Sequence, residues 1–438
     1  MYLPGKHHRA ALMRHDTSVI LKRFFFIEQS LIISQAGWLA GIEPIEVKTT
    51  LPRLIWQDAK TADDMRTRVF ELRYPSRLME IGEETALMNL VHEARNAPNA
   101  LALYRSLLEV FKPALRKAYQ DYLELADEIG DGPSIRFMRL AVQEKDEQIR
   151  LLADMLPPME AATPQAKGAA DAWVQALRQH QSDIGGIGLE PAETESDTTF
   201  ELPGRVPFAL AQIPARDHRF REVRYYWPDV IDPSFPYGDG LRLQLRSAIS
   251  HLNEVWAVET GGALLHAFAD DLEWEFVLDA ARWTYDEARH CTMGLERLRQ
   301  WGFDLSELPL GTYIYDSAYG QDPIYRLGML YYFETKNIKR KPERIRSFVS
   351  YADEVSQHDM DFDWADETIH AAYGHHWLAA LLKKRGFDDP DPHLIRARCE
   401  ALVRATVDRA TDAERQEIRE IAEHLITRAE QRAADKHK

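Results

Sequence analysis

Two copies of one short motif lie in the second half of the chain, and they constrain its fold more than any other feature. In "YDEARHCT" a glutamate, Glu287, is followed three residues later by His290. In "ADETIHAAYG" the same spacing joins Glu367 to His370. Residues three apart lie on one face of a helix, so each pair presents a carboxylate and an imidazole side by side.

A further glutamate precedes each motif at an identical distance along the chain. Glu254 lies 33 residues before Glu287, and Glu334 lies 33 residues before Glu367. An antiparallel helical hairpin with its turn at the midpoint would place each glutamate level with its partner, since about 16 residues at ~1.5 Å each run along either arm. The sequence therefore predicts two such hairpins.

The turns of the two hairpins are expected to differ. In the first, Asp271 stands where it could cap the second helix. In the second, Pro342 must kink or break the first arm, and the turn at residues 350–353 contains no glycine.

Four inward-facing carboxylates and two imidazoles would be unstable in a protein core without cations, because buried charges need partners. Two divalent metal ions would supply that charge, with carboxylates bridging the ions and one histidine for each. Glu259 is the alternative to Glu254 as a ligand, although its distance from Glu287 differs from the 33 residues that separate Glu334 from Glu367. The predicted metal ligands are Glu254, Glu287, His290, Glu334, Glu367 and His370.

Asp286 and Asp366 each directly precede a predicted ligand, Glu287 and Glu367. Their side chains point about 100° away from those of the glutamates around the helix. Either could orient a ligand histidine from another helix. Cys291, His375 and His376 are interpreted as core or surface residues rather than ligands.

The four segments resemble a bacterial ferritin-like family of unassigned activity over residues 247–390. "YDEARHCTMGLERL" and "DETIHAAYGHHWLAALLKKRGFDDP" resemble its second and fourth bundle helices. "NEVWAVE" and "YYFETKNIKRKP" resemble the first and third. The resemblance implies a ferritin-like four-helix bundle with its metal ligands at the six positions given above.

The rest of the chain also has helical periodicity, so the predicted fold class is all-α. We expect an N-terminal helical domain at residues 1–155 and a linker with an irregular aromatic and proline-rich segment at 156–240. The bundle is expected at 241–388 and charged C-terminal helices at 389–438.

Within the first domain, residues 19–42 are interpreted as a core helix and residues 130–134 as a turn. Its pair Glu144 and Glu147 has no carboxylate partners at the bundle spacing, which predicts that this half binds no metal.

Composition excludes several classes of function. The net charge of −16 over 438 residues argues against nucleic-acid binding. The basic run "KNIKRKPERIR" at 336–346 is interpreted as a solvated surface. The sequence contains no run of about 18 uncharged apolar residues, so no membrane span is predicted. Two widely separated cysteines suit a reducing, cytoplasmic location.

A carboxylate-rich site with two histidines favours iron or manganese over zinc or copper. The expected cofactor is two iron ions, with manganese or a mixed pair as variants. The expected activity is that of an oxygen-dependent oxidoreductase whose partners are dioxygen and a small organic substrate, in a chain that could form a homodimer. Iron storage, and a structural protein that keeps metal for folding, are the alternatives.

Overall fold

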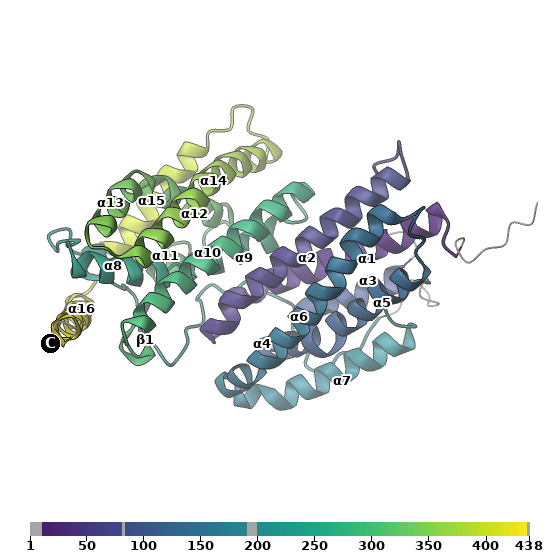
Figure 1. Ribbon diagram of the computed structural model, residues 1–438, viewed down its shortest axis with the longest axis horizontal. Coiled ribbons are helices and arrows are strands. Elements are labelled where there is room, and N and C mark those ends of the chain that lie inside the picture. The colour runs from purple at the N-terminus through teal and green to yellow at the C-terminus, as the bar shows by residue number, and fades with distance from the viewer. Residues whose placement is uncertain (1–10, 81–83, 191–198, 436–438) are drawn as a thin grey trace, which may run out of the picture. The chain divides into compact units, whose positions relative to one another are not determined.

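The computed structural model describes residues 11–80, 84–190 and 199–435, and most of them are helical, which confirms the all-α prediction (Figure 1). The chain divides into two compact units. The first comprises residues 1–35 and 54–209, and the second comprises residues 36–53 and 210–438. In the described ranges, no helix is long and apolar enough to cross a membrane.

Among the described residues up to 183, seven α-helices form, and the division between the units falls within the first two of them. They are α1 (Arg14–Trp38), α2 (Ile45–Leu72), α3 (Thr85–Glu93), α4 (Ala100–Ser106), α5 (Lys112–Leu125), α6 (Gly132–Ala162) and α7 (Lys167–Asp183). The expected core helix is α1, in which Phe24, Ile27 and Leu31 are fully buried. A turn separates α5 from α6 as predicted, but it covers residues 126–131, and the predicted turn residues Gly132, Pro133 and Ser134 begin α6.

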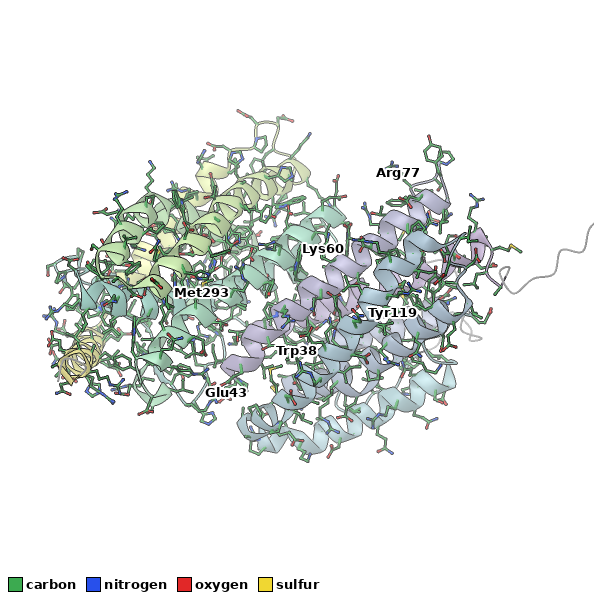
Figure 2. All side chains as sticks on the ribbon, viewed as in Figure 1. Trp38, Glu43, Lys60, Arg77, Tyr119 and Met293 are labelled. Carbon is green, nitrogen blue, oxygen red and sulfur yellow. The ribbon has the colours of Figure 1, made fainter. Side chains whose placement is uncertain are left out.

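A cluster of paired charges lies in the core of the first unit. The ammonium group of Lys145 lies 2.6 Å from Glu28 and 2.5 Å from Asp58, and that of Lys112 lies 2.8 Å from Asp58. Tyr119, labelled in Figure 2, donates a hydrogen bond to Glu28. Two carboxylates thus meet two ammonium groups, so the cluster is formally neutral.

The lysines favour the charged form of Asp58. Burial opposes the charge of Asp58, but the ammonium groups of Lys112 and Lys145 outweigh it and lower the pKa of Asp58. Burial likewise opposes the charge of Lys145, yet Asp58 and Glu28 raise its pKa to about 12. That this half of the chain binds no metal stays a prediction.

The second unit contains the remaining helices and two strands of three residues each. The helices are α8 (Leu241–Leu252), α9 (Val255–Phe268), α10 (Trp274–Gln300), α11 (Tyr313–Asp316), α12 (Ile324–Asn337), α13 (Lys341–Ser350), α14 (Glu354–Lys384), α15 (Pro392–Val407) and α16 (Asp412–Asp435). Strands β1 (Arg221–Val223) and β2 (Pro309–Gly311) pair in parallel, with Glu222 opposite Leu310.

Short turns of tighter or wider helix connect several elements. The 3-10 turns cover Leu39–Gly41, Ala94–Asn96, Pro164–Ala166, Pro228–Val230, Leu305–Glu307 and Ile338–Arg340, and a π-helical turn covers Leu107–Phe111.

The compact units do not follow the predicted domain limits. Residues 156–209, expected to be a linker, belong to the first unit. There α7 packs against α4, and buried Trp173 donates a hydrogen bond to Ser106 (3.0 Å). The predicted C-terminal helices form, and they pack on the second unit: α15 lies against α12, and α16 against α8.

Four helices of the second unit pack in a closed cycle. Helix α9 packs against α10 and α12, and α14 packs against the same two helices. Figure 1 shows α9 continuing into α10 through a short turn. The predicted cap at Asp271 is wrong: α10 begins at Trp274, and the extended residue Glu273 precedes it without a side-chain cap. The carbonyl of Asp271 instead accepts a hydrogen bond from Lys384.

The second hairpin is interrupted as predicted. Helix α12 ends at Asn337, and Pro342 lies in the first turn of α13. The chain reverses through Ala352, whose φ of 54° is in the left-handed region. Asp353 then caps α14 by accepting a hydrogen bond from the Ser356 amide (3.0 Å).

We expect Lys145→Met to destabilise the first unit by about 3–5 kcal/mol, because two buried carboxylates would lose a shared counterion. Equilibrium unfolding in urea, followed by circular dichroism, measures the loss. Lys117→Met is the matched control, since the Lys117–Asp121 pair on α5 is solvent-exposed and should contribute little. Equal losses in both variants would contradict the role assigned to the buried cluster.

Candidate metal centre

The structure brings all six predicted ligands together inside the four-helix cycle. Glu254 precedes the first residue of α9, at the break between α8 and α9. Helix α10 contributes a glutamate and a histidine, α12 one glutamate, and α14 another glutamate and histidine. Their ligand atoms form overlapping groups in which all atoms lie within 4.8 Å of one another.

One group surrounds His290. Its Nδ1 lies 3.3 Å from Glu254 Oε2, 3.6 Å from Glu287 Oε2 and 3.6 Å from Asp363 Oδ1. The imidazole is completely buried. Three carboxylate oxygens from three helical segments thus face one ring nitrogen.

The other group surrounds His370. Its Nδ1 lies 3.2 Å from Glu287 Oε1 and 3.7 Å from Glu334 Oε1. The indole of Trp283 donates hydrogen bonds to the same two oxygens, at 3.1 and 3.2 Å. Glu287 therefore directs one oxygen toward each histidine, between the two groups.

Several of these buried atoms lack a hydrogen-bond partner. They are Glu254 Oε2, His290 Nδ1, Asp363 Oδ1, Glu367 Oε2 and His370 Nδ1. A buried polar atom without a partner costs about 1–3 kcal/mol, more if it is charged. Five such atoms at one place are the pattern of a ligand set that faces a cation.

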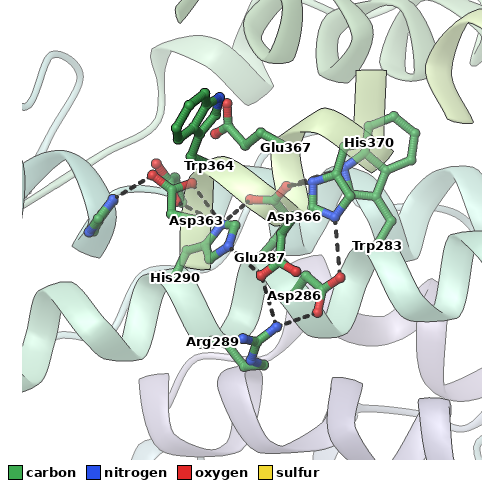
Figure 3. Close-up of polar contacts among 12 residues, drawn as sticks. Trp283, Asp286, Glu287, Arg289, His290, Asp363, Trp364, Asp366, Glu367 and His370 are labelled. Atoms are coloured by element: carbon green, nitrogen blue, oxygen red, sulfur yellow. Dashed lines mark hydrogen bonds and ion pairs between the residues drawn. The ribbon is translucent and has the colours of Figure 1, made fainter. Parts of the chain in front are cut away.

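The opposite nitrogen of each histidine faces an aspartate from another helix. His290 Nε2 lies 3.3 Å from Asp366 Oδ2, and His370 Nε2 lies 3.4 Å from Asp286 Oδ2 (Figure 3). Arg289 lies beside both aspartates, 2.9 Å from Asp366. These contacts match the orienting role predicted for the two aspartates. They direct both Nδ1 atoms toward the carboxylate groups.

The sequence analysis missed Asp363, Lys341 and His251. Asp363 lies four residues before Glu367 on α14, so helical spacing alone would have placed it on the ligand face. Lys341 donates a hydrogen bond to Asp363, and its ammonium lies 2.9 Å from Glu367. His251 Nε2 lies 3.1 Å from Asp363.

The site contains more negative than positive charge. Burial and the charge of Asp363 raise the pKa of Glu254 to about 7. Burial and Glu287 raise the pKa of Glu334, and burial with Glu334 raises that of Glu367 well above its ordinary value. These carboxyl groups hold protons more tightly than isolated ones, because too few cations lie near them.

Glu259 lies elsewhere and has its own partners. It is fully buried, with the ammonium of Lys48 and the guanidinium of Arg216 each 2.5 Å away. The structure therefore places Glu254, and not Glu259, among the ligand atoms.

The other residues considered in the sequence lie as expected. His375 and His376 are exposed on α14. Cys291 is buried, and its thiol donates to the Leu252 carbonyl (3.1 Å).

The family described as "Protein of unknown function (DUF455)" has a model that matches residues 205–424, about half of the chain, and the chain belongs to this family. The matched range includes every ligand position described above. Neither a curated protein nor a solved structure matches the chain.

We expect Asp366→Asn to weaken metal binding about 10–100-fold, because the residue that orients His290 would lose its charge. Titration of the metal-free protein with Mn²⁺, followed by calorimetry, measures the affinity. Asp361→Asn, an exposed position on the same helix, is the control. An unchanged affinity in Asp366→Asn would contradict the role assigned to Asp366 in orienting His290.

Proposed function

We propose that this protein is a di-metal carboxylate protein that uses two iron ions and dioxygen to oxidise a small organic substrate. Manganese, or one ion of each metal, would fit the same ligands. The observation that carries the proposal is the set of five buried atoms without a hydrogen-bond partner that three helical segments direct at one place.

The ligand types fit two ions of this kind. Glu254, Glu287 and His290 would hold one ion, and Glu334 and His370, again with Glu287, the other. Glu367, which is grouped with His290 and Asp363, would be a further ligand of the first ion. The two oxygens of Glu287 face different histidines, as a bridging carboxylate requires. Oxygen ligands with one imidazole per ion suit iron or manganese, and no thiol takes part.

Formal charge supports the same number of ions. Two further residues, Asp363 and Lys341, lie against the predicted ligands. With them the site holds five carboxylates and one ammonium group when all are ionised, a formal charge of −4. Two divalent cations would neutralise it, which meets the requirement that buried charges be compensated.

Helix arrangement supports the proposal that the second unit contains a ferritin-like four-helix bundle. In such bundles two helices each provide a glutamate, and the other two each provide a Glu-x-x-His motif. Here α12 and the start of α9 carry the single glutamates, while α10 and α14 carry the motifs. The motif helices α10 and α14 pack against each other, and each packs against one single-glutamate helix, α10 against α9 and α14 against α12.

A cavity gives small molecules access to the ligands. It has a volume of about 830 Å³, and four of the glutamates line it: Glu254, Glu287, Glu334 and Glu367. That volume suits a small organic molecule. Ferrous iron bound there would supply electrons to dioxygen, while Trp256, Ile314 and Phe333 on the wall would bind the substrate and limit the entry of water. The cavity favours a substrate-oxidising role over iron storage or a metal kept for folding.

We expect anaerobically purified protein to contain about two metal ions per chain, as in other carboxylate-bridged bundles. Glu367→Ala should lose at least one, measured by metal analysis after growth with iron. Glu296→Ala, an exposed glutamate on α10, should retain both. Wild-type protein without metal after iron supplementation would contradict the proposal.

The ferrous wild-type protein should also consume dioxygen on exposure to air, followed with an oxygen electrode and by optical spectra. Glu367→Ala should consume much less per chain. A protein that holds two ions but consumes no dioxygen would favour a structural role for the metal. Elution as a cage on size-exclusion chromatography would favour storage.

A further inference from the structure

The cavity beside the ligand carboxylates has a second wall that is rich in positive charge. Lys336, Arg340 and Arg344 line it, and all three belong to the basic run that the sequence analysis interpreted as a solvated surface. Lys341, from the same run, contacts two ligand carboxylates. Arg344 follows Lys341 by three residues on α13, so the two side chains leave the same face of that helix.

A fourth cation on this wall, Arg246 of α8, has unused hydrogen-bonding capacity. Its side chain is 93% buried and pairs with Asp229 through Nε (2.9 Å) and Nη2 (3.1 Å). Its remaining nitrogen, Nη1, is buried without a hydrogen-bond partner. A guanidinium group with one buried, unsatisfied donor on a cavity wall indicates a missing acceptor.

Two guanidinium groups gather around one aromatic ring. The central carbon of Arg246 lies 4.9 Å from the ring centroid of Tyr237, and that of Arg344 lies 4.7 Å from it. Only Arg246 has a carboxylate partner. In the described part of the chain, Lys336, Arg340 and Arg344 form no ion pair, although the glutamates of the metal site, Glu400 and Asp408 line the same cavity.

The remainder of the lining combines apolar and aromatic side chains with a few charged ones, among them Glu400, Arg404 and Asp408. Trp256 and Phe333 pack with their rings 5.1 Å apart, and Ile314, Val403 and Val407 complete this part of the wall. Arg246 precedes Glu254 by eight residues, roughly 12 Å along a helix. The distance from the cationic wall to the metal ligands therefore matches a medium-sized organic molecule.

We propose that the substrate of this site is an organic acid with an apolar body and one anionic head group, a carboxylate or phosphate. The head group accepts hydrogen bonds from Arg246 and from the neighbouring cations Lys336, Arg340 and Arg344. The apolar body lies along Trp256 and Phe333 and brings its carbon atoms to the metal ligands. This inference rests on the proposed function for the chemistry, but the anion site itself is made by residues that are not metal ligands.

The test uses 3-phenylpropionate as the probe and 3-phenylpropanol as its neutral counterpart, each titrated by calorimetry into the full-length protein. Phenyl phosphate distinguishes a phosphate from a carboxylate preference. We expect the acid to bind at least about tenfold more tightly than the alcohol, since hydrogen bonds to charged groups are stronger than neutral ones. Arg340→Gln/Arg344→Gln should remove most of that difference, and Lys336→Gln part of it.

Arg346→Gln is the matched control, because Arg346 lies on the same helix, is exposed and does not line the cavity. Circular dichroism establishes that each variant is folded. Equal binding of the acid and the alcohol, or equal binding by the control and the double variant, would overturn the inference.

The titrations are made with both metal-free and Mn²⁺-loaded protein, so that the two proposals can fail separately. We expect tighter binding of the acid with Mn²⁺, because the ions compensate the carboxylates that would repel it. An arginine-dependent preference for the acid in a protein that takes up no metal would support the anion site and contradict the proposed function. A protein that binds two metal ions but binds the acid no more tightly than the alcohol would support the proposed function and overturn the anion site.

Discussion

The structure depends on how buried carboxylates are compensated. In the first unit, Glu28 and Asp58 meet Lys112 and Lys145, and the cluster is neutral within the protein. In the second unit, five carboxylates surround two histidines with a single lysine among them. Burial of a charge is costly in both places, but only the first cluster has as many lysines as carboxylates. The excess of carboxylates in the second cluster is the physical basis of the proposed metal centre.

The residues around the second cluster hold it in one arrangement. Asp286 and Asp366 face the outer nitrogens of the histidines, and Trp283 donates to the oxygens of two glutamates. The inner nitrogens are thereby left without partners. These groups would be available to ions without rearrangement, and a preorganised ligand set of this kind loses little conformational entropy on binding.

The ligands could be predicted from sequence because their positions follow from helical geometry and equal chain separation. Asp363 obeys the same geometry, but its importance depends on Lys341, which reaches it from another helix. The failed cap at Asp271 has a local cause: Glu273, in an extended conformation, is the residue that immediately precedes α10. Composition also misled the interpretation of residues 156–209, where Trp173 packs a helix onto the first unit. The basic run at 336–346 has the composition of a surface, yet four of its side chains, along the 3-10 turn at Ile338–Arg340 and the helices on either side, face the site and its cavity.

Iron K-edge X-ray absorption of the anaerobically loaded protein tests the central claim most directly. Our account predicts a shell of oxygen and nitrogen ligands without sulfur, scattering from imidazole, and a second iron within about 4 Å, as in other two-metal sites. In Glu367→Ala the iron–iron scattering should weaken. Isolated iron without imidazole scattering would contradict a shared centre built by the two hairpins.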